Sequence, residues 1–92
     1  MIIHKIDIHL EDWSVSYPTG AIAYDVNGNI VDSDYCDTTE EFIEFLNRHK
    51  DEINWTTTVH VIFDIANVDN DECAVDCARE IKKHVDFIKY GV

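Results

Sequence analysis

The fold is decided by the stretch Ala21-Ile-Ala-Tyr-Asp-Val-Asn-Gly-Asn-Ile-Val-Asp-Ser-Asp-Tyr35. Its two ends, residues 21–26 and 30–35, are rich in β-branched and aromatic side chains, which is typical of strands. The Asn27-Gly28-Asn29 segment between them favours a hairpin turn, because asparagine and glycine tolerate a positive φ. The stretch therefore predicts an antiparallel hairpin, and the rest of the chain must complete a sheet around it.

The sequence before the hairpin predicts one strong strand and one weak one. Residues 2–10 alternate, with polar side chains on one side and an apolar set on the other, namely Ile2, Ile6, Ile8 and Leu10. This period of two is typical of a half-buried strand. Residues 14–18 form a weaker extended segment, and the following Pro18-Thr-Gly20 indicates a turn.

The sequence after the hairpin predicts a helix, a strand and a second helix. Thr38 and Glu41 have the spacing of a capping box, and the helix that follows shows one apolar face made by Phe42, Phe45, Leu46 and His49. Residues 58–65 are β-branched and almost uncharged, which favours a central strand. Asp69 or Asn70 would then cap a helix whose apolar face is Ala74, Cys77, Ala78, Ile81 and Val85.

These elements predict an α+β fold with the order β-β-β-α-β-α. Residues 1–92 form a single domain, with a mixed, mainly antiparallel sheet of about four strands and two helices packed on it. The element order resembles the first half of a ribonuclease H-like fold. That resemblance concerns topology, and fold-level analogy alone does not transfer a function.

The charge is strongly negative and unevenly distributed. The chain has 19 acidic residues against seven Lys and Arg, a net charge of −12, and residues 6–47 contain no Lys or Arg. This balance argues against direct nucleic-acid binding and favours a basic partner. No apolar run is long enough for a membrane span, and three cysteines without a CxxC pair indicate a cytoplasmic protein.

The element order also defines an enzymatic alternative. Ribonuclease H-like nucleases hold two metal ions with carboxylates from the first strand, a helix and the end of a later strand. The matching positions here would be Asp7, one of Glu40, Glu41 or Glu44, and Asp64. Asp7 lies on the polar side of its strand, where a solvated carboxylate is the default, and the acidic surface would repel a polyanionic substrate. We therefore expect no catalytic residues and no enzyme.

Metal sites are also not expected. Cys73 and Cys77 are four residues apart and share a helix side with Glu80 and His84, but Cys77 falls on the apolar face, where cysteine acts as a small hydrophobe. The acidic run 69–72 lacks the glycine and distal glutamate of a calcium loop. No cofactor is predicted.

The remaining candidate is an acidic surface on the hairpin and first helix. Its predicted partner-binding residues are Tyr24, Asp25, Asp32, Asp34, Tyr35, Asp37, Glu40, Glu41 and Glu44. Asp32 and Asp34 are two residues apart on one strand and so point the same way. Carboxylates spaced on rigid elements resemble a phosphate backbone and suit a cleft lined with Arg and Lys.

In size, charge and lack of catalytic motifs the chain resembles phage-encoded anti-CRISPR proteins and DNA-mimic anti-restriction proteins. The resemblance implies a small acidic inhibitor in the host cytoplasm, which occupies the nucleic-acid-binding surface of a basic nuclease or effector complex. Two alternatives stay open: the nuclease, and a generic acidic interaction or immunity protein. A homodimer is neither indicated nor excluded.

Overall fold

The computed structural model describes residues 2–10, 20–62 and 72–91, and the side chains of the last range from residue 75 onward. Its elements are β1 (Lys5–His9), β2 (Gly20–Tyr24), β3 (Ile30–Tyr35), α1 (Thr39–Arg48), β4 (Thr58–Ile62) and α3 (Glu72–Tyr90). The α+β class and the order β-β-β-α-β-α are therefore confirmed.

The four strands form one mixed sheet with the order β3-β2-β1-β4. β2 is antiparallel to both β1 and β3, whereas β4 is parallel to β1. The prediction of a central position for residues 58–65 is wrong for the described part, because β4 ends the sheet and β1 lies inside it. A β-branched strand without charge is typical of the centre of a sheet. Here β4 lies at the edge, and its apolar side chains pack against a helix instead.

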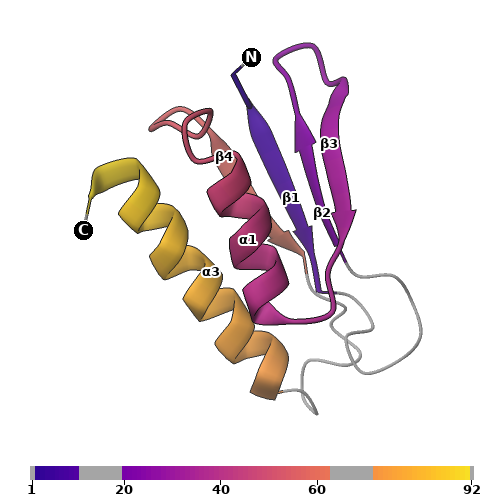
Figure 1. The fold of residues 1–92 in the computed structure, drawn as a ribbon, viewed down its shortest axis with the longest axis vertical. Helices are drawn as coiled ribbons and strands as arrows, with labels where there is room; N and C mark the ends of the chain where they lie inside the picture. Colours follow the sequence, from indigo (N-terminus) through magenta and orange to yellow (C-terminus); the bar gives the residue numbers. More distant parts are fainter. Residues whose placement is uncertain (1, 11–19, 63–71, 92) are drawn as a thin grey trace.

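Both described helices cover the same face of the sheet (Figure 1). The core between the two layers contains Ile6 and Ile8 of β1, Phe42 and Phe45 of α1, and Ile81 of α3, all fully buried. The two helices lie side by side and are joined by a hydrogen bond of 2.7 Å between the His84 ring and the Asn47 side chain. One face of the sheet is thus fixed by apolar burial, which is the main stabilising contribution.

The hairpin loop spans residues 25–29 and is ordered by one carboxylate. Asp25 Oδ1 accepts hydrogen bonds from the backbone N–H groups of Asn27 and Asn29, both at 2.9 Å. Gly28 has a φ of +83°, a left-handed conformation that glycine adopts without steric cost. The predicted hairpin is confirmed, and Asp25 proves to be part of its turn.

The capping box predicted for α1 is present in an extended form. Thr38 Oγ1 accepts a hydrogen bond from the Glu41 N–H at 3.2 Å, while Glu41 Oε2 accepts one from the Asp37 N–H at 3.1 Å. The Glu41 N–H, one of the donors that a helix start leaves without partners, is thereby satisfied, and the second bond ties the preceding residue to the first turn.

The alternation predicted for residues 2–10 fails at its start. Ile2 is 65% exposed, whereas Ile3 is fully buried. These two residues precede β1, so the pleat of the strand does not dictate where they point. Ile3 is held instead by a buried hydrogen bond of 2.8 Å, in which the Thr57 hydroxyl donates to the Ile3 carbonyl.

Several sequence predictions lie outside the described residues: the extended segment 14–18, the end of the strand at 63–65, and the helix cap at Asp69 or Asn70. Within the described ranges, neither helix combines the length and hydropathy needed to cross a bilayer.

Candidate functional site

Asp32 and Asp34, two of the predicted partner-binding residues, point toward the helices. Asp32 pairs across the sheet with Ala23, and Asp34 pairs with Ala21. Both alanines are fully buried beneath the helical layer. Because cross-strand partners share a face of the sheet, the two carboxylates lie on the helix side of the edge strand β3 rather than on its outer side.

The end of α1 meets these carboxylates with two basic side chains. Arg48 Nη2 donates to Asp34 Oδ2 at 2.7 Å, and Arg48 Nη1 lies 3.4 Å from Asp32 Oδ2. The hydrogen bond with Asp34 raises the pKa of the Arg48 guanidinium above its ordinary value, against a smaller opposing effect of burial. The negative charge of Asp32 and Asp34 is therefore partly neutralised within the chain.

His49 lies between two carboxylates and is only 8% exposed. Its Nε2 is 2.7 Å from Asp32 Oδ2, and its Nδ1 is 3.0 Å from Glu52 Oε1. A neutral imidazole has one N–H and donates to only one of these oxygens, whereas the doubly protonated ring donates to both. The ring also packs on Phe45, with centroids 5.1 Å apart. We call the set Asp32, Asp34, Arg48, His49 and Glu52 the carboxylate–imidazole network.

The network sets the ionisation of Asp32. The hydrogen bond from His49 is the largest influence and lowers the pKa of Asp32 below its ordinary value, with further lowering by the Arg48 and His49 charges. Partial burial acts in the opposite direction but does not prevail. Asp32 is thus held ionised by internal partners, which is the behaviour of a structural carboxylate.

Four other predicted carboxylates form a more open cluster, which we call the acidic edge: Asp37, Glu40, Glu41 and Glu44. Asp37, Glu40 and Glu44 are exposed, and Glu41 is half-buried through its capping role. They occupy the start of α1 and the connection from β3. Carboxylates in the first turn also interact favourably with the helix dipole, so part of this clustering is explained without a partner.

The two predicted tyrosines have different surroundings. Tyr35 is 51% exposed, and a hydrogen bond with the Asp37 carboxylate raises its pKa above the ordinary value. Tyr35 therefore belongs with the acidic edge. Tyr24 does not, because its ring lies 4.6 Å beneath the Lys5 ammonium at the other end of the hairpin.

The structure does not gather the residues of the nuclease alternative. Asp7 alternates with the buried Ile6 and Ile8, so it lies on the face of the sheet away from α1 and its glutamates. Asp64 falls outside the described residues. Among the residues that are described, no group of three or more His, Cys, Asp or Glu side chains has the arrangement needed to hold a metal ion.

The expectation that Asp7 is solvated is wrong. Asp7 is 9% exposed, and its Oδ1 is buried with no hydrogen-bond partner among the described residues. Its Oδ2 lies 3.7 Å from the Lys5 ammonium. The alternation of a strand shows on which face of the sheet a residue lies, but it does not show whether that face is exposed. At Asp7, on the inner strand β1, the face away from the helices is buried.

The cysteines behave as core residues where they are described. Cys77 is 2% exposed and Cys36 is fully buried, and burial is the largest of the influences that raise the pKa of Cys36 to about 12. The Cys73 side chain lies outside the described part. That Cys73 shares a side of the helix with Cys77 therefore stays a prediction.

The main feature that sequence reasoning missed is the carboxylate–imidazole network. The sequence places His49 on the apolar face of the first helix but gives no sign that His49 or Arg48 contacts the hairpin. A histidine within an apolar helix face does signal a buried polar contact, since such a ring must find partners.

Comparison with protein-family models, curated proteins and solved structures found no match to this chain.

Proposed function

We propose that this protein is a stoichiometric inhibitor that binds a basic protein surface and blocks access of nucleic acid to it. Its target would be a nuclease or a CRISPR or restriction effector in the cytoplasm of a host cell. The observation that carries the proposal is the net charge of −12, together with the absence of Lys and Arg from residues 6–47. Such a field accelerates association with a cationic cleft and repels free nucleic acid.

The acidic edge is the best candidate for the contact surface. Glu40 and Glu44 are exposed on α1 and one turn apart, which places their Cβ atoms roughly 5–6 Å from each other. Arg or Lys side chains that normally contact successive phosphates would then meet successive carboxylates. Tyr35 beside Asp37 supplies an aromatic side chain of the kind that anchors protein interfaces.

Asp32 and Asp34 take a supporting part in this proposal. Because they are engaged by Arg48 and His49, a partner would have to displace these contacts to use them directly. Their contribution is to hold the end of α1 against β3, which keeps the acidic edge in a fixed orientation. The network therefore acts by positioning the surface.

The two other functions have less support. The nuclease needs Asp7 and a helix glutamate to converge, and the sheet separates them. A generic acidic interaction protein differs from the inhibitor only in its partner, so the identity of a bound protein decides between them.

The test is affinity capture from a nuclease-treated bacterial lysate at graded salt, followed by mass spectrometry. We expect one basic nucleic-acid enzyme or effector complex to be enriched and to be lost as the salt concentration rises. Purified target should then lose binding to its nucleic acid in a titration with this protein.

Charge reversal locates the surface. The variant Glu40→Lys with Glu44→Lys should abolish capture, while the matched variant Asp51→Lys with Glu80→Lys changes the net charge equally at exposed positions elsewhere. If both double variants lose the partner equally, the acidic edge is not the contact surface and only net charge matters. If neither variant loses it, the proposal is wrong for that partner.

A further inference from the structure

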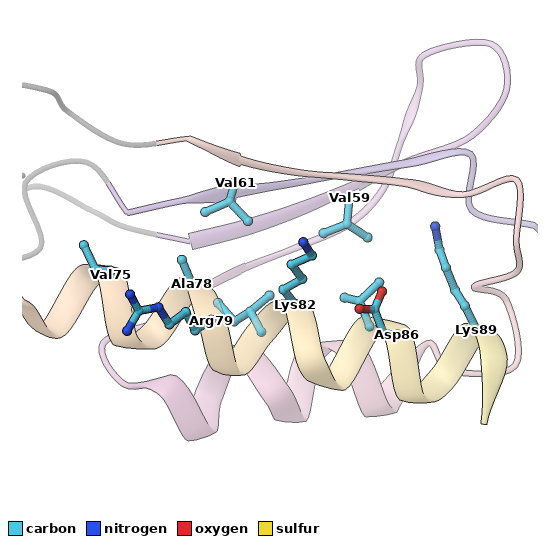
Figure 2. Close-up of a pocket in the computed structure, with 10 residues that line it drawn as sticks. Val59, Val61, Val75, Ala78, Arg79, Lys82, Asp86 and Lys89 are labelled. Carbon is cyan, nitrogen blue, oxygen red and sulfur yellow. The ribbon is translucent and has the colours of Figure 1, made fainter. Parts of the chain in front are cut away.

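An apolar groove runs between α3 and β4, the strand that ends the described sheet (Figure 2). Its volume is about 430 Å³, and its floor is aliphatic: Val59, Val61, Val75, Ala78, Ile81 and Val85. Val59 and Val61 project from β4 toward the helix (Figure 2), and both are only partly buried. A further apolar side chain inserted here would cover surface that the chain itself leaves incompletely packed.

The outer side of β4, beside the groove, is paired with no strand among the described residues. Thr58 N–H donates to the His4 carbonyl, and the Ile62 carbonyl accepts from Leu10, so alternate residues of β4 bond to β1. In a parallel ladder the intervening residues direct their N–H and C=O groups away from that neighbour. Val59 and Val61 therefore present their peptide groups outward, and no strand of the described ranges pairs with them.

The rim of the groove is positive on an otherwise acidic molecule. Arg79, Lys82 and Lys89 line it together with a single acid, Asp86, which gives a net charge of +2. The chain as a whole carries −12, so all its other residues together carry −14. In Figure 2 the Lys82 side chain rises from α3 toward β4 between Val61 and Val59.

The three cations differ in how far they are already satisfied. Lys89 donates to the Thr57 carbonyl, and Arg79 lies 3.7 Å from Asp76 in a highly exposed pair. Lys82 makes no ion pair with any residue in the described part of the chain. Lys82 is thus the cation most available to a carboxylate brought into the groove.

We propose that this groove binds an extended segment of a partner protein, which adds to the outer edge of β4 as a further strand. The side chains of the segment that face α3 would combine aliphatic residues, packed on Val59 and Val61, with a carboxylate that pairs with Lys82. Addition of a strand to an open edge supplies backbone hydrogen bonds, and the pockets for alternate side chains supply specificity. This inference does not depend on the proposed inhibitor function, since no residue of the acidic edge lines the groove.

A second copy of the chain fits the groove less well. Among the described strands only β3 and β4 end the sheet. β4 carries no acid, and the acids of β3, Asp32 and Asp34, are held by Arg48 and His49 of their own chain. A copy therefore offers no free acidic strand edge, whereas an extended acidic and aliphatic segment satisfies both the rim and the floor.

The test is an NMR titration of the full chain with two synthetic seven-residue peptides. In the first, valines flank one glutamate at alternate positions and threonines fill the rest, and in the second lysine replaces the glutamate. We expect the glutamate peptide to shift the amide signals of Val59, Val61 and the middle of α3, and to slow hydrogen exchange at the two valine amides. The lysine peptide should bind about tenfold more weakly, since it brings like charges together.

Variants at adjacent helix positions provide the control. Lys82→Glu should weaken the glutamate peptide about tenfold and restore binding of the lysine peptide, while Lys83→Glu, whose side chain lies outside the groove, should change neither. The proposal is overturned if the glutamate peptide leaves the β4 amides unshifted, or if the two peptides bind alike. It is also overturned if sedimentation shows a dimer that Lys82→Glu dissociates, because a second copy would then be the occupant.

Discussion

Replacement of Asp32 by Asn tests whether the carboxylate–imidazole network stabilises the fold. The substitution keeps the size of the side chain but removes its charge. It weakens the 2.7 Å contact with His49 Nε2 and the 3.4 Å contact with Arg48. Glu52 remains as the partner of His49 Nδ1, so the ring keeps one carboxylate.

The expected cost follows from the burial of the two partners. A hydrogen bond involving a charged group contributes about 1.5–3 kcal/mol net. His49 has a side chain that is 10% exposed, but that of Asp32 is 30% exposed, so solvent screening favours the lower end. We expect Asp32→Asn to lower the free energy of unfolding by about 1.5 kcal/mol, which in a domain of this size lowers Tm by roughly 6–12 °C.

The effect of Asp32 should also depend on pH in a defined direction. Its pKa in the folded protein lies below the ordinary 3.8, chiefly because of the His49 hydrogen bond. A carboxyl with a lowered pKa stabilises the fold fully above its unfolded pKa and loses that contribution as pH falls through the folded value. The difference between wild type and Asp32→Asn should therefore be fully present above the ordinary pKa of 3.8 and shrink as the pH falls below it.

Urea unfolding followed by circular dichroism at several pH values measures both quantities, with Asp34→Asn as the matched control. Asp34 contacts the same Arg48, but both side chains are nearly half exposed, so its loss should cost well under 1 kcal/mol. Equal costs for the two variants, or a cost for Asp32→Asn that persists unchanged at low pH, would refute the reasoning.

Three further predictions concern other parts of the fold. Gly20→Ala should destabilise the protein by about 1–3 kcal/mol in urea unfolding, because a Cβ there would lie 2.4 Å from the Asp34 carbonyl oxygen; unchanged stability would mean that β2 and β3 are further apart. Cys36, with its pKa raised to about 12, should resist iodoacetamide at about pH 8 in the native state and react after unfolding, since alkylation requires the thiolate; peptide mass spectrometry reads this out, and rapid native labelling would contradict it. In the free protein the amides of Val59 and Val61 should exchange with deuterium faster than the β4 amides bonded to β1, and equal protection along β4 would show that its edge is covered.

The order of elements could be predicted because each has a local signal. Gly28 adopts the left-handed conformation that the Asn-Gly turn implies, and Thr38 and Glu41 make the contacts of a capping box. Phe42 and Phe45 are buried, as their helical spacing indicates. These signals depend on residues close together in the sequence, so they can be recognised without knowing which elements pack together in the fold.

The direction of the hairpin carboxylates could not be predicted from the same information. A period of two shows that Asp32 and Asp34 share a side, but the register with β2 decides which side that is. Polar residues usually face solvent, so the sequence alone predicts an outer position for both. Inward-pointing charges at an edge strand also hinder pairing with another chain, and here Arg48 and His49 make that arrangement stable.

The place of β4 illustrates the same limit. A run of β-branched residues without charge is expected where both faces are buried, whereas β4 is an edge strand whose apolar side chains face a partly open groove. The local sequence shows that a side chain is apolar, but it does not show whether the chain itself or a partner molecule covers that side chain. The disagreement between pattern and position is therefore informative, because an apolar strand at an open edge presents surface that a partner can cover.

The two edge strands of the described sheet, β3 and β4, have different surroundings, and this difference bears on how the protein interacts. At β3, Asp32 and Asp34 point inward and are bound by Arg48 and His49 at the end of α1. The exposed glutamates of the acidic edge lie on α1 itself. Recognition there depends on charge and should be sensitive to salt. At β4, peptide groups that no described strand pairs lie together with aliphatic side chains and Lys82. The proposed recognition there combines backbone hydrogen bonds with apolar burial and should persist at higher salt. The two surfaces use different residues, Glu40 and Glu44 on α1 and Lys82 with the β4 valines in the groove, so each can be removed by substitution without changing a residue of the other.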